Sequence, residues 1–364
     1  MVTNTSDIAV KPAKRREDFW DVIRGILILC VFAGHAIGGW NYITFDFLVQ
    51  PGSFLFDQWI VSRCFINCSV PLFIFISGYM VNEKYYSTLG KFYIKRIPRF
   101  AVPYIFWTIV YVLVEIIIYK TDVTLEGTFC GWYGIQLYYL LVMVQLVILT
   151  PIFFKVKNKK AVLIASCVIN VVNNAIHVVY HYTEGTIVPN ELMLCTCYIF
   201  FYTFGMYLRN TDPDALKKIS LKVSIILFAI GAAIYIAASF AVVHFTNSAL
   251  AGVSFITIAS FICSVGSIIL VFKLRERSTG YVAKNPVAKM LRWFGEYSMD
   301  FFVVHWIFEN YIKVWFLNNV STDYMILSNV IIVTATTALC VVYALIARAF
   351  RKYVINPINM KFKK

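Results

Sequence analysis

The chain has 364 residues, of which 60% are hydrophobic and 17% aromatic, and it carries a formal net charge of +14. A water-soluble domain of this length needs a larger share of polar residues for its surface. The composition therefore excludes that class and favours a protein embedded in a bilayer. The apolar runs are also too long for the short alternating strands of a membrane barrel.

Ten segments are long and apolar enough to cross the hydrocarbon core as helices, which takes about 20 residues each. In chain order they are residues 25–42, 60–82, 101–119, 132–153, 161–181, 192–208, 223–244, 250–272, 295–316 and 325–347. The sequence therefore predicts an all-α integral membrane protein with about ten transmembrane helices. We expect residues 1–24 to form a cytoplasmic segment, residues 25–347 the membrane domain, and residues 348–364 a basic cytoplasmic tail.

Positive charge is distributed unevenly between the two sides of the predicted membrane domain. If both termini are cytoplasmic, 30 of the 33 Lys and Arg residues lie on the cytoplasmic side, and the exceptions are Arg63, Lys120 and Lys313. Cytoplasmic loops of multi-pass proteins carry such an excess, so we expect both termini in the cytoplasm. A basic face of this kind contacts anionic lipid or binds a phosphate-bearing cytosolic ligand.

The first predicted helix carries two ionisable residues, which are costly at membrane depth. Arg24 and His35 are eleven residues apart, which is about 16 Å along a helix and nearly a whole number of turns, so both lie on one face. We expect Arg24 at the cytoplasmic boundary and His35 near the bilayer centre. An arginine can extend to the headgroups and a histidine can bond a neighbouring helix, but their shared stripe favours a water-lined cavity.

A second histidine, His305, is predicted at a similar depth in the ninth segment. Glu309 follows one turn later, and Ser298 precedes it by two turns on the same face. A carboxylate one turn away can hold a histidine in one tautomer and make it more basic. Alternatively, the two groups neutralise each other between helices.

The fifth predicted helix has a stripe of polar side chains at spacings of three and four residues: Asn170, Asn173, Asn174, His177 and His181. Polar stripes of this kind hold membrane helices together. An acceptor-side passage is the alternative.

A basic loop follows the second predicted helix. Arg96 and Arg99 are three residues apart, so two guanidinium groups can bind one phosphate, and anchoring to lipid headgroups is the alternative. Ser77 and Gly78 lie late in the second helix, where small residues let backbones approach closely. The nine cysteines match no metal or redox spacing, so we expect reduced thiols and no metal site.

Four stretches resemble the membrane acyltransferase 3 family, in the matching order. They are "RREDFWDVIRGILILCVFAGH", with an arginine, ten residues and then a histidine, followed by "FISGYM", "KRIPRFAVP" and "GEYSMDFFVVHWI". The resemblance covers about residues 17–347. Its most specific part is the arginine-to-histidine spacing after an acidic residue, here Asp21.

The resemblance implies an O-acyltransferase that moves an acyl group, commonly acetyl and sometimes succinyl, from cytoplasmic acyl-CoA to a hydroxyl of a cell-envelope glycan or related acceptor. By this resemblance His35 and Arg24 are the essential pair, and the donor site contains Arg96, Arg99, Ser77 and Gly78. We expect His305, Glu309 and Asp21 to support them.

The partners expected from this function are acetyl-CoA or another acyl-CoA as co-substrate, a glycan or lipid-linked carbohydrate acceptor, and membrane lipids. No nucleic acid and no permanently bound cofactor are expected. The expected location is the cell membrane, either a bacterial inner membrane or a plasma membrane, with several passes.

Acyl transfer to a hydroxyl requires a base with a pKa near neutral pH, and histidine supplies one. We therefore assign His35 as general base for direct attack on the thioester, with an acyl-histidine intermediate as the other route. The competing class is a non-enzymatic permease or flippase for a glycan precursor. Transporters commonly show repeated halves and interrupted helices, and neither is evident in this sequence.

Overall fold

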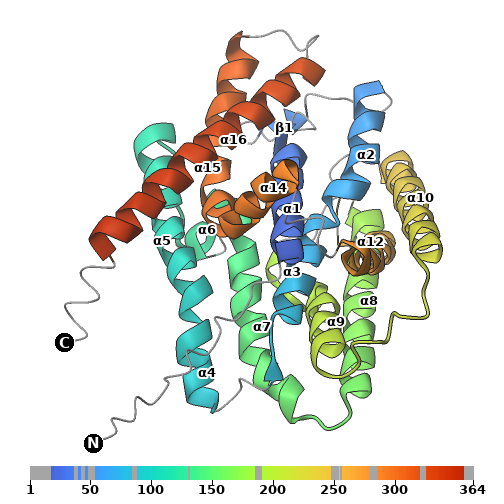
Figure 1. The fold of residues 1–364 in the computed structure, drawn as a ribbon. Helices are drawn as coiled ribbons and strands as arrows, with labels where there is room; N and C mark the ends of the chain where they lie inside the picture. The colour runs from blue at the N-terminus through green and yellow to red at the C-terminus, as the bar shows by residue number, and fades with distance from the viewer. Residues whose placement is uncertain are drawn as a thin grey trace, which may run out of the picture.

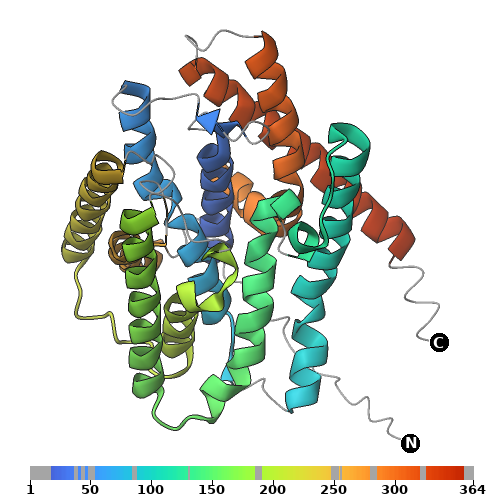
Figure 2. The same cartoon turned by 180° about the vertical axis from the view of Figure 1, so that it is seen from behind.

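A computed structural model describes residues 18–36, 40–41, 46–47, 54–83, 88–129, 132–184, 191–246, 254, 256–278, 285–319 and 325–355. These residues form a bundle of helices with α1 (Asp18–Ala36) at its centre (Figure 1). Helices α5 (Pro98–Val114) and α10 (Leu221–Thr246) lie on opposite flanks of the bundle, as both views show (Figure 2).

The other helices follow the predicted order along the chain. They are α2 (Phe54–Ile66), α3 (Ser69–Tyr79), α4 (Leu89–Arg96), α6 (Leu125–Phe129), α7 (Tyr138–Lys155), α8 (Lys159–Glu184), α9 (Ile199–Asn210), α12 (Ile258–Arg277), α14 (Pro286–Glu296), α15 (Ser298–Asn319) and α16 (Met325–Phe350). Short 3-10 and π turns flank several of them. One antiparallel pair, β1 (Trp40–Asn41) and β2 (Asp46–Phe47), follows α1.

Eight helical segments of the described residues are long and apolar enough to cross a membrane, which confirms the helical membrane class. Helices α2 and α3 contribute to one of these segments, and α4 and α5 to another. Helices α9 and α15 are not among the eight, because α9 has only 12 residues and the polar side chains of α15, among them His305, Glu309 and Lys313, lower its mean hydropathy. The predicted count of about ten is therefore not confirmed, and the cytoplasmic position of both termini stays a prediction.

Helix α14 lies in a segment that the sequence places in a cytoplasmic loop. The Asn285 side chain caps its N-terminus by accepting hydrogen bonds from two backbone N–H groups, at 2.8 and 3.2 Å, as helix-capping asparagines do. Helix α14 crosses α1 at two glycines. A Cβ atom on Gly25 would lie 1.9 Å from the Leu291 carbonyl oxygen, and one on Gly295 would lie 1.7 Å from the Asp21 carbonyl oxygen. Only glycine allows this backbone contact, which fixes the first half of α1.

An aromatic core lies between α1, α3 and α12. The Trp20 ring is fully buried, and its centroid is 5.1 Å from that of Tyr79 and 6.4 Å from that of Phe272. The Arg275 guanidinium lies 5.4 Å from the centroid of the Tyr79 ring, a cation–π distance. This cluster holds the first turns of α1 in place, and with them Asp21 and Arg24.

Candidate active site

His35 lies in the last turn of α1, against α15. Its ring centroid is 5.4 Å from that of His305 and 4.9 Å from that of Trp306, which meets it edge to face. The Phe32 ring packs on His305 at 5.1 Å. The structure therefore brings together the two histidines that the sequence places at similar depth.

The tautomer of His305 follows from its hydrogen bond. Its Nδ1 lies 2.8 Å from the Phe302 carbonyl oxygen, and a carbonyl can only accept, so Nδ1 carries the proton and Nε2 is left as an acceptor. Of the two alternatives for Glu309, control of this tautomer is not what the structure shows, because the backbone carbonyl one turn earlier makes that bond. Neither Glu309 oxygen has a hydrogen-bond partner among the described residues, nor does His305 Nε2.

Two basic residues complete the cluster around His35. The Lys313 ammonium donates to the His35 carbonyl oxygen, one of the last carbonyls of α1, which have no partner within the helix. Arg63, on α2, stacks on the Trp59 ring with its guanidinium carbon 5.4 Å from the centroid, and it is close enough to interact electrostatically with His35 and Glu309. Lys313 is only 6% exposed and Glu309 only 1%.

Arg63 and Lys313 are not among the predicted site residues, although the sequence carries a signal for them. Both are exceptions to the predicted charge asymmetry between the two sides of the membrane. A basic residue that departs from this rule within an apolar segment needs a buried partner or a polar cavity. The third exception, Lys120, is exposed in the structure, whereas Arg63 is partly buried and Lys313 is buried. Lys120 therefore needs no such partner.

Arg24 lies nearer the N-terminus of α1 and is paired with Asp21. The Arg24 Nη1 atom is 3.2 Å from Asp21 Oδ1, and the aspartate side chain is only 1% exposed. A buried carboxylate is tolerated where a cation compensates its charge. This pair explains how the first turns of α1 accommodate an arginine within an otherwise apolar helix.

A tyrosine that the sequence analysis did not assign connects Arg24 to Ser77. The Ser77 hydroxyl donates to the Phe73 carbonyl oxygen at 2.8 Å, so at 3.3 Å the Tyr139 hydroxyl must be the donor to Ser77. Arg24 interacts electrostatically with the Tyr139 phenol. The Tyr139 ring also contacts Phe302, with centroids 5.2 Å apart, and Phe302 contacts His305 at 5.9 Å. Contacts therefore run without interruption from Ser77 to the histidines.

The two arginines predicted to bind the donor differ in exposure. Arg96, at the end of α4, is partly buried, with its guanidinium carbon 5.4 Å from the centroid of the Phe92 ring. It interacts electrostatically with Tyr202 on α9, and Tyr202 in turn with Tyr139. Arg99, in the first turn of α5, is exposed. Arg96 thus faces the interior while Arg99 faces outward.

Gly78 lies where the backbones of α3 and α9 touch, which explains why this position has no side chain. A Cβ atom there would lie 2.1 Å from the Tyr202 carbonyl oxygen, and one on Gly205 would lie 2.2 Å from the Phe75 carbonyl oxygen. These two glycines let α3 and α9 pack backbone to backbone. Gly78 therefore positions Ser77 and Tyr202 relative to each other.

The asparagine stripe of α8 binds irregular backbone on its neighbours. The Asn170 amide donates to the Cys197 carbonyl oxygen at 2.9 Å, and the Asn174 amide donates to the Thr257 carbonyl oxygen at 3.1 Å. The first carbonyl belongs to the 3-10 turn before α9, and the second to the residue that caps α12. These contacts favour the interpretation that the stripe holds helices together.

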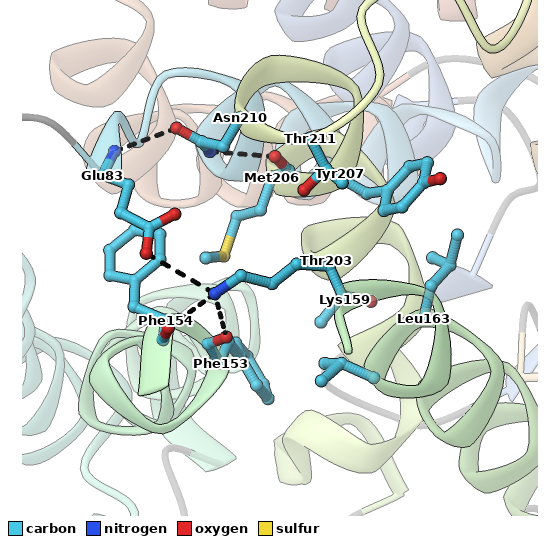
Figure 3. A pocket seen from close by; sticks show the side chains of 11 residues that line it. Glu83, Phe153, Phe154, Lys159, Leu163, Thr203, Met206, Tyr207, Asn210 and Thr211 are labelled. Atoms are coloured by element: carbon cyan, nitrogen blue, oxygen red, sulfur yellow. Dashed lines mark hydrogen bonds and ion pairs between the residues drawn. The ribbon is translucent and has the colours of Figure 1, made fainter. Parts of the chain in front are cut away.

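A separate hollow lies between the end of α7, the start of α8 and the end of α9 (Figure 3). At its centre the Lys159 ammonium donates to the Phe153 and Phe154 carbonyl oxygens, and it lies 3.5 Å from Glu83 Oε1. This arrangement satisfies carbonyls at the C-terminus of α7. None of the predicted site residues lines the hollow, and the described residues contain no group of side chains suited to a metal ion.

The fold and these clusters define a multi-pass membrane protein whose central helix carries ionisable side chains at both ends. Such groups within apolar helices indicate a functional site rather than a scaffold. The chain belongs to the acyltransferase 3 family, since the model of its acyltransferase domain matches residues 17–348. The resemblance seen in the sequence is thereby confirmed, and membership supports acyl transfer as the reaction class. No curated protein and no solved structure matches the chain.

Proposed function

We propose that the protein transfers an acyl group, acetyl in the first instance, from cytoplasmic acyl-CoA to a hydroxyl of a cell-envelope glycan or lipid-linked carbohydrate. The proposed location is a bacterial inner membrane or a plasma membrane. Family membership supports acyl transfer. The observation that carries the choice of catalytic residue is the contact between His35 and His305, which sets two imidazoles side by side within the bundle.

The donor enters on the side where α4 meets α5 in this proposal. Arg96 and Arg99 bind phosphate groups of the coenzyme, because guanidinium groups match phosphate geometry. The acyl-pantetheine arm then extends past Ser77, Tyr139 and Arg24 toward His35. The hydrogen bond between Tyr139 and Ser77 supports this path, and so does the electrostatic influence that links Arg96 to Tyr202, Tyr202 to Tyr139, and Tyr139 to Arg24.

The chemical step needs a base for the acceptor hydroxyl. As the hydroxyl oxygen attacks the thioester carbonyl carbon, an imidazole nitrogen of His35 takes its proton. The new C–O bond forms, the C–S bond breaks, and the coenzyme leaves as a thiolate that takes the proton back from His35. Lys313 holds the last turn of α1 through the His35 carbonyl, so it positions the imidazole without contacting the reacting atoms.

The test compares the purified His35→Ala variant with the wild type. A positioned general base contributes typically 10²–10⁴-fold, so we expect acetyl transfer to fall by at least about 100-fold while stabilisation by acetyl-CoA persists. His244→Ala is the matched control, because His244 is exposed near the end of α10. Transfer close to the wild-type rate in His35→Ala would remove His35 from the chemistry. Mass spectrometry of envelope glycans from cells with and without the gene would identify acyl group and acceptor.

A further inference from the structure

Glu309 and His305 present buried acceptor atoms toward the end of α1. Glu309 lies midway between His305 and Lys313 on α15, at spacings of four residues, so the three share one face of the helix. Both neighbours contact His35, His305 through its ring and Lys313 through the backbone carbonyl. The Glu309 carboxylate therefore also lies on the face that packs toward His35.

These acceptors lack donors within the described part of the chain. Both Glu309 oxygens and His305 Nε2 make no hydrogen bond there, although Glu309 is 1% exposed and His305 fully buried. A buried polar group left without a partner is destabilising, because it has lost its hydrogen bonds to water. A carboxylate and an unprotonated ring nitrogen can only accept, so a molecule that completes the site has to bring O–H or N–H donors.

Two basic side chains face the same carboxylate. Lys313 donates to the His35 carbonyl, and a Cβ atom on Gly34, the neighbour of His35, would lie 3.9 Å from Arg63 Nη1. Both basic side chains also interact electrostatically with Glu309 and with His35. The guanidinium group offers a planar fork of donors and the ammonium group three rotatable donors. The ammonium bond to the His35 carbonyl is compatible with an anion at the same nitrogen, because one ammonium makes several hydrogen bonds.

On the basis of the proposed function, we infer that Arg63, Glu309 and Lys313 form the acceptor subsite beside His35, and that the acceptor is an anionic saccharide. Its hydroxyl groups donate to Glu309 and His305, and its carboxylate or phosphate binds Arg63 and Lys313. This arrangement brings a neighbouring hydroxyl to His35. Such a molecule supplies donors for the acceptor atoms and a negative charge for the two basic side chains. A neutral glycan or an apolar alcohol lacks the negative charge.

The test measures binding of small probes to the full-length purified protein by thermal stabilisation. The probes are methyl β-glucuronide, glucose 6-phosphate and the neutral methyl β-glucoside, so that the first two arms separate a carboxylate from a phosphate. We expect one anionic probe to bind at least tenfold more tightly than the neutral one. Arg63→Gln should remove that preference, since a charge-assisted hydrogen bond is worth about tenfold or more. Arg63→Lys should keep most of it.

Lys120→Gln is the matched control, because it removes another basic residue predicted on the same side of the membrane, at an exposed position. Its preference should equal that of the wild type. Equal binding of charged and neutral probes, no binding of any probe, or an unchanged preference in Arg63→Gln would overturn the inference. Stabilisation by acetyl-CoA, measured without sugar, tests the proposed function separately. A protein that binds acetyl-CoA but does not discriminate between sugars contradicts only the acceptor subsite.

Discussion

Replacing Gly78 by alanine tests whether this residue acts by packing or by binding the donor. The added Cβ atom would lie 2.1 Å from the Tyr202 carbonyl oxygen, and ordinary contact begins at 3.4 Å. Helices α3 and α9 must therefore separate by about 1.3 Å at this point, and no side-chain rotation relieves the clash because the neighbour is backbone. Forced insertions of this kind cost typically about 1–3 kcal/mol.

We expect a fall in thermal stability of the purified variant. At about 2 °C per kcal/mol for a large domain, the apparent Tm in detergent drops by roughly 2–6 °C. Gly90→Ala is the matched control, because a Cβ atom on Gly90 meets nothing within 4 Å. Alanine is the better helix former by up to about 1 kcal/mol, so this variant should melt at or above the wild-type temperature.

The outcome separates the two roles of Gly78. If Gly78→Ala melts with the wild type but shows a raised KM for acetyl-CoA, the packing argument is refuted, and the glycine contacts the donor instead. If both stability and transfer fall, and Gly205→Ala on the facing helix shows the same two losses, both glycines act by keeping α3 and α9 in contact.

Two further predictions concern polar side chains that bind backbone carbonyls. Lys159→Met removes two hydrogen bonds at the end of α7 and should destabilise the protein by about 1–3 kcal/mol, whereas Lys157→Met, at an exposed position, should not. Equal melting of these two variants would contradict the capping role. Asn170→Ala leaves the Cys197 carbonyl without its 2.9 Å bond and should cost about 1–3 kcal/mol without changing the KM for acetyl-CoA. A changed KM with unaltered stability would favour a passage over a structural stripe.

The polar residues at membrane depth could be recognised from the sequence because their cost is local. An ionisable side chain in an apolar helix is unfavourable whatever surrounds it, so Arg24, His35, His305 and Glu309 stand out before any contact is known. Their depth follows from the rise per residue of a helix. The helical class was predictable for the same reason, since a bilayer requires each spanning segment to satisfy its own backbone hydrogen bonds.

The partners of those residues could not be predicted, because they are joined by tertiary packing alone. Lys313 and the His35 carbonyl are 278 positions apart, and nothing in the local sequence of either helix specifies the other. Tyr139 looks like one more aromatic residue of an apolar helix until its hydroxyl is found at Ser77. A bond from Glu309 to His305 was one of two alternatives in the sequence, yet the Phe302 carbonyl takes that place.

The sequence by itself determined the helical membrane class and which side chains are costly within apolar helices, because both follow from transfer free energies that act residue by residue. The tertiary structure alone decided which helices meet, since that depends on backbone approach at Gly25, Gly295, Gly78 and Gly205. It also placed α14 across α1 and gathered the two histidines with Arg63 and Lys313. Membrane helices have little hydrophobic preference for one neighbour over another, so close packing and a few hydrogen bonds make that choice.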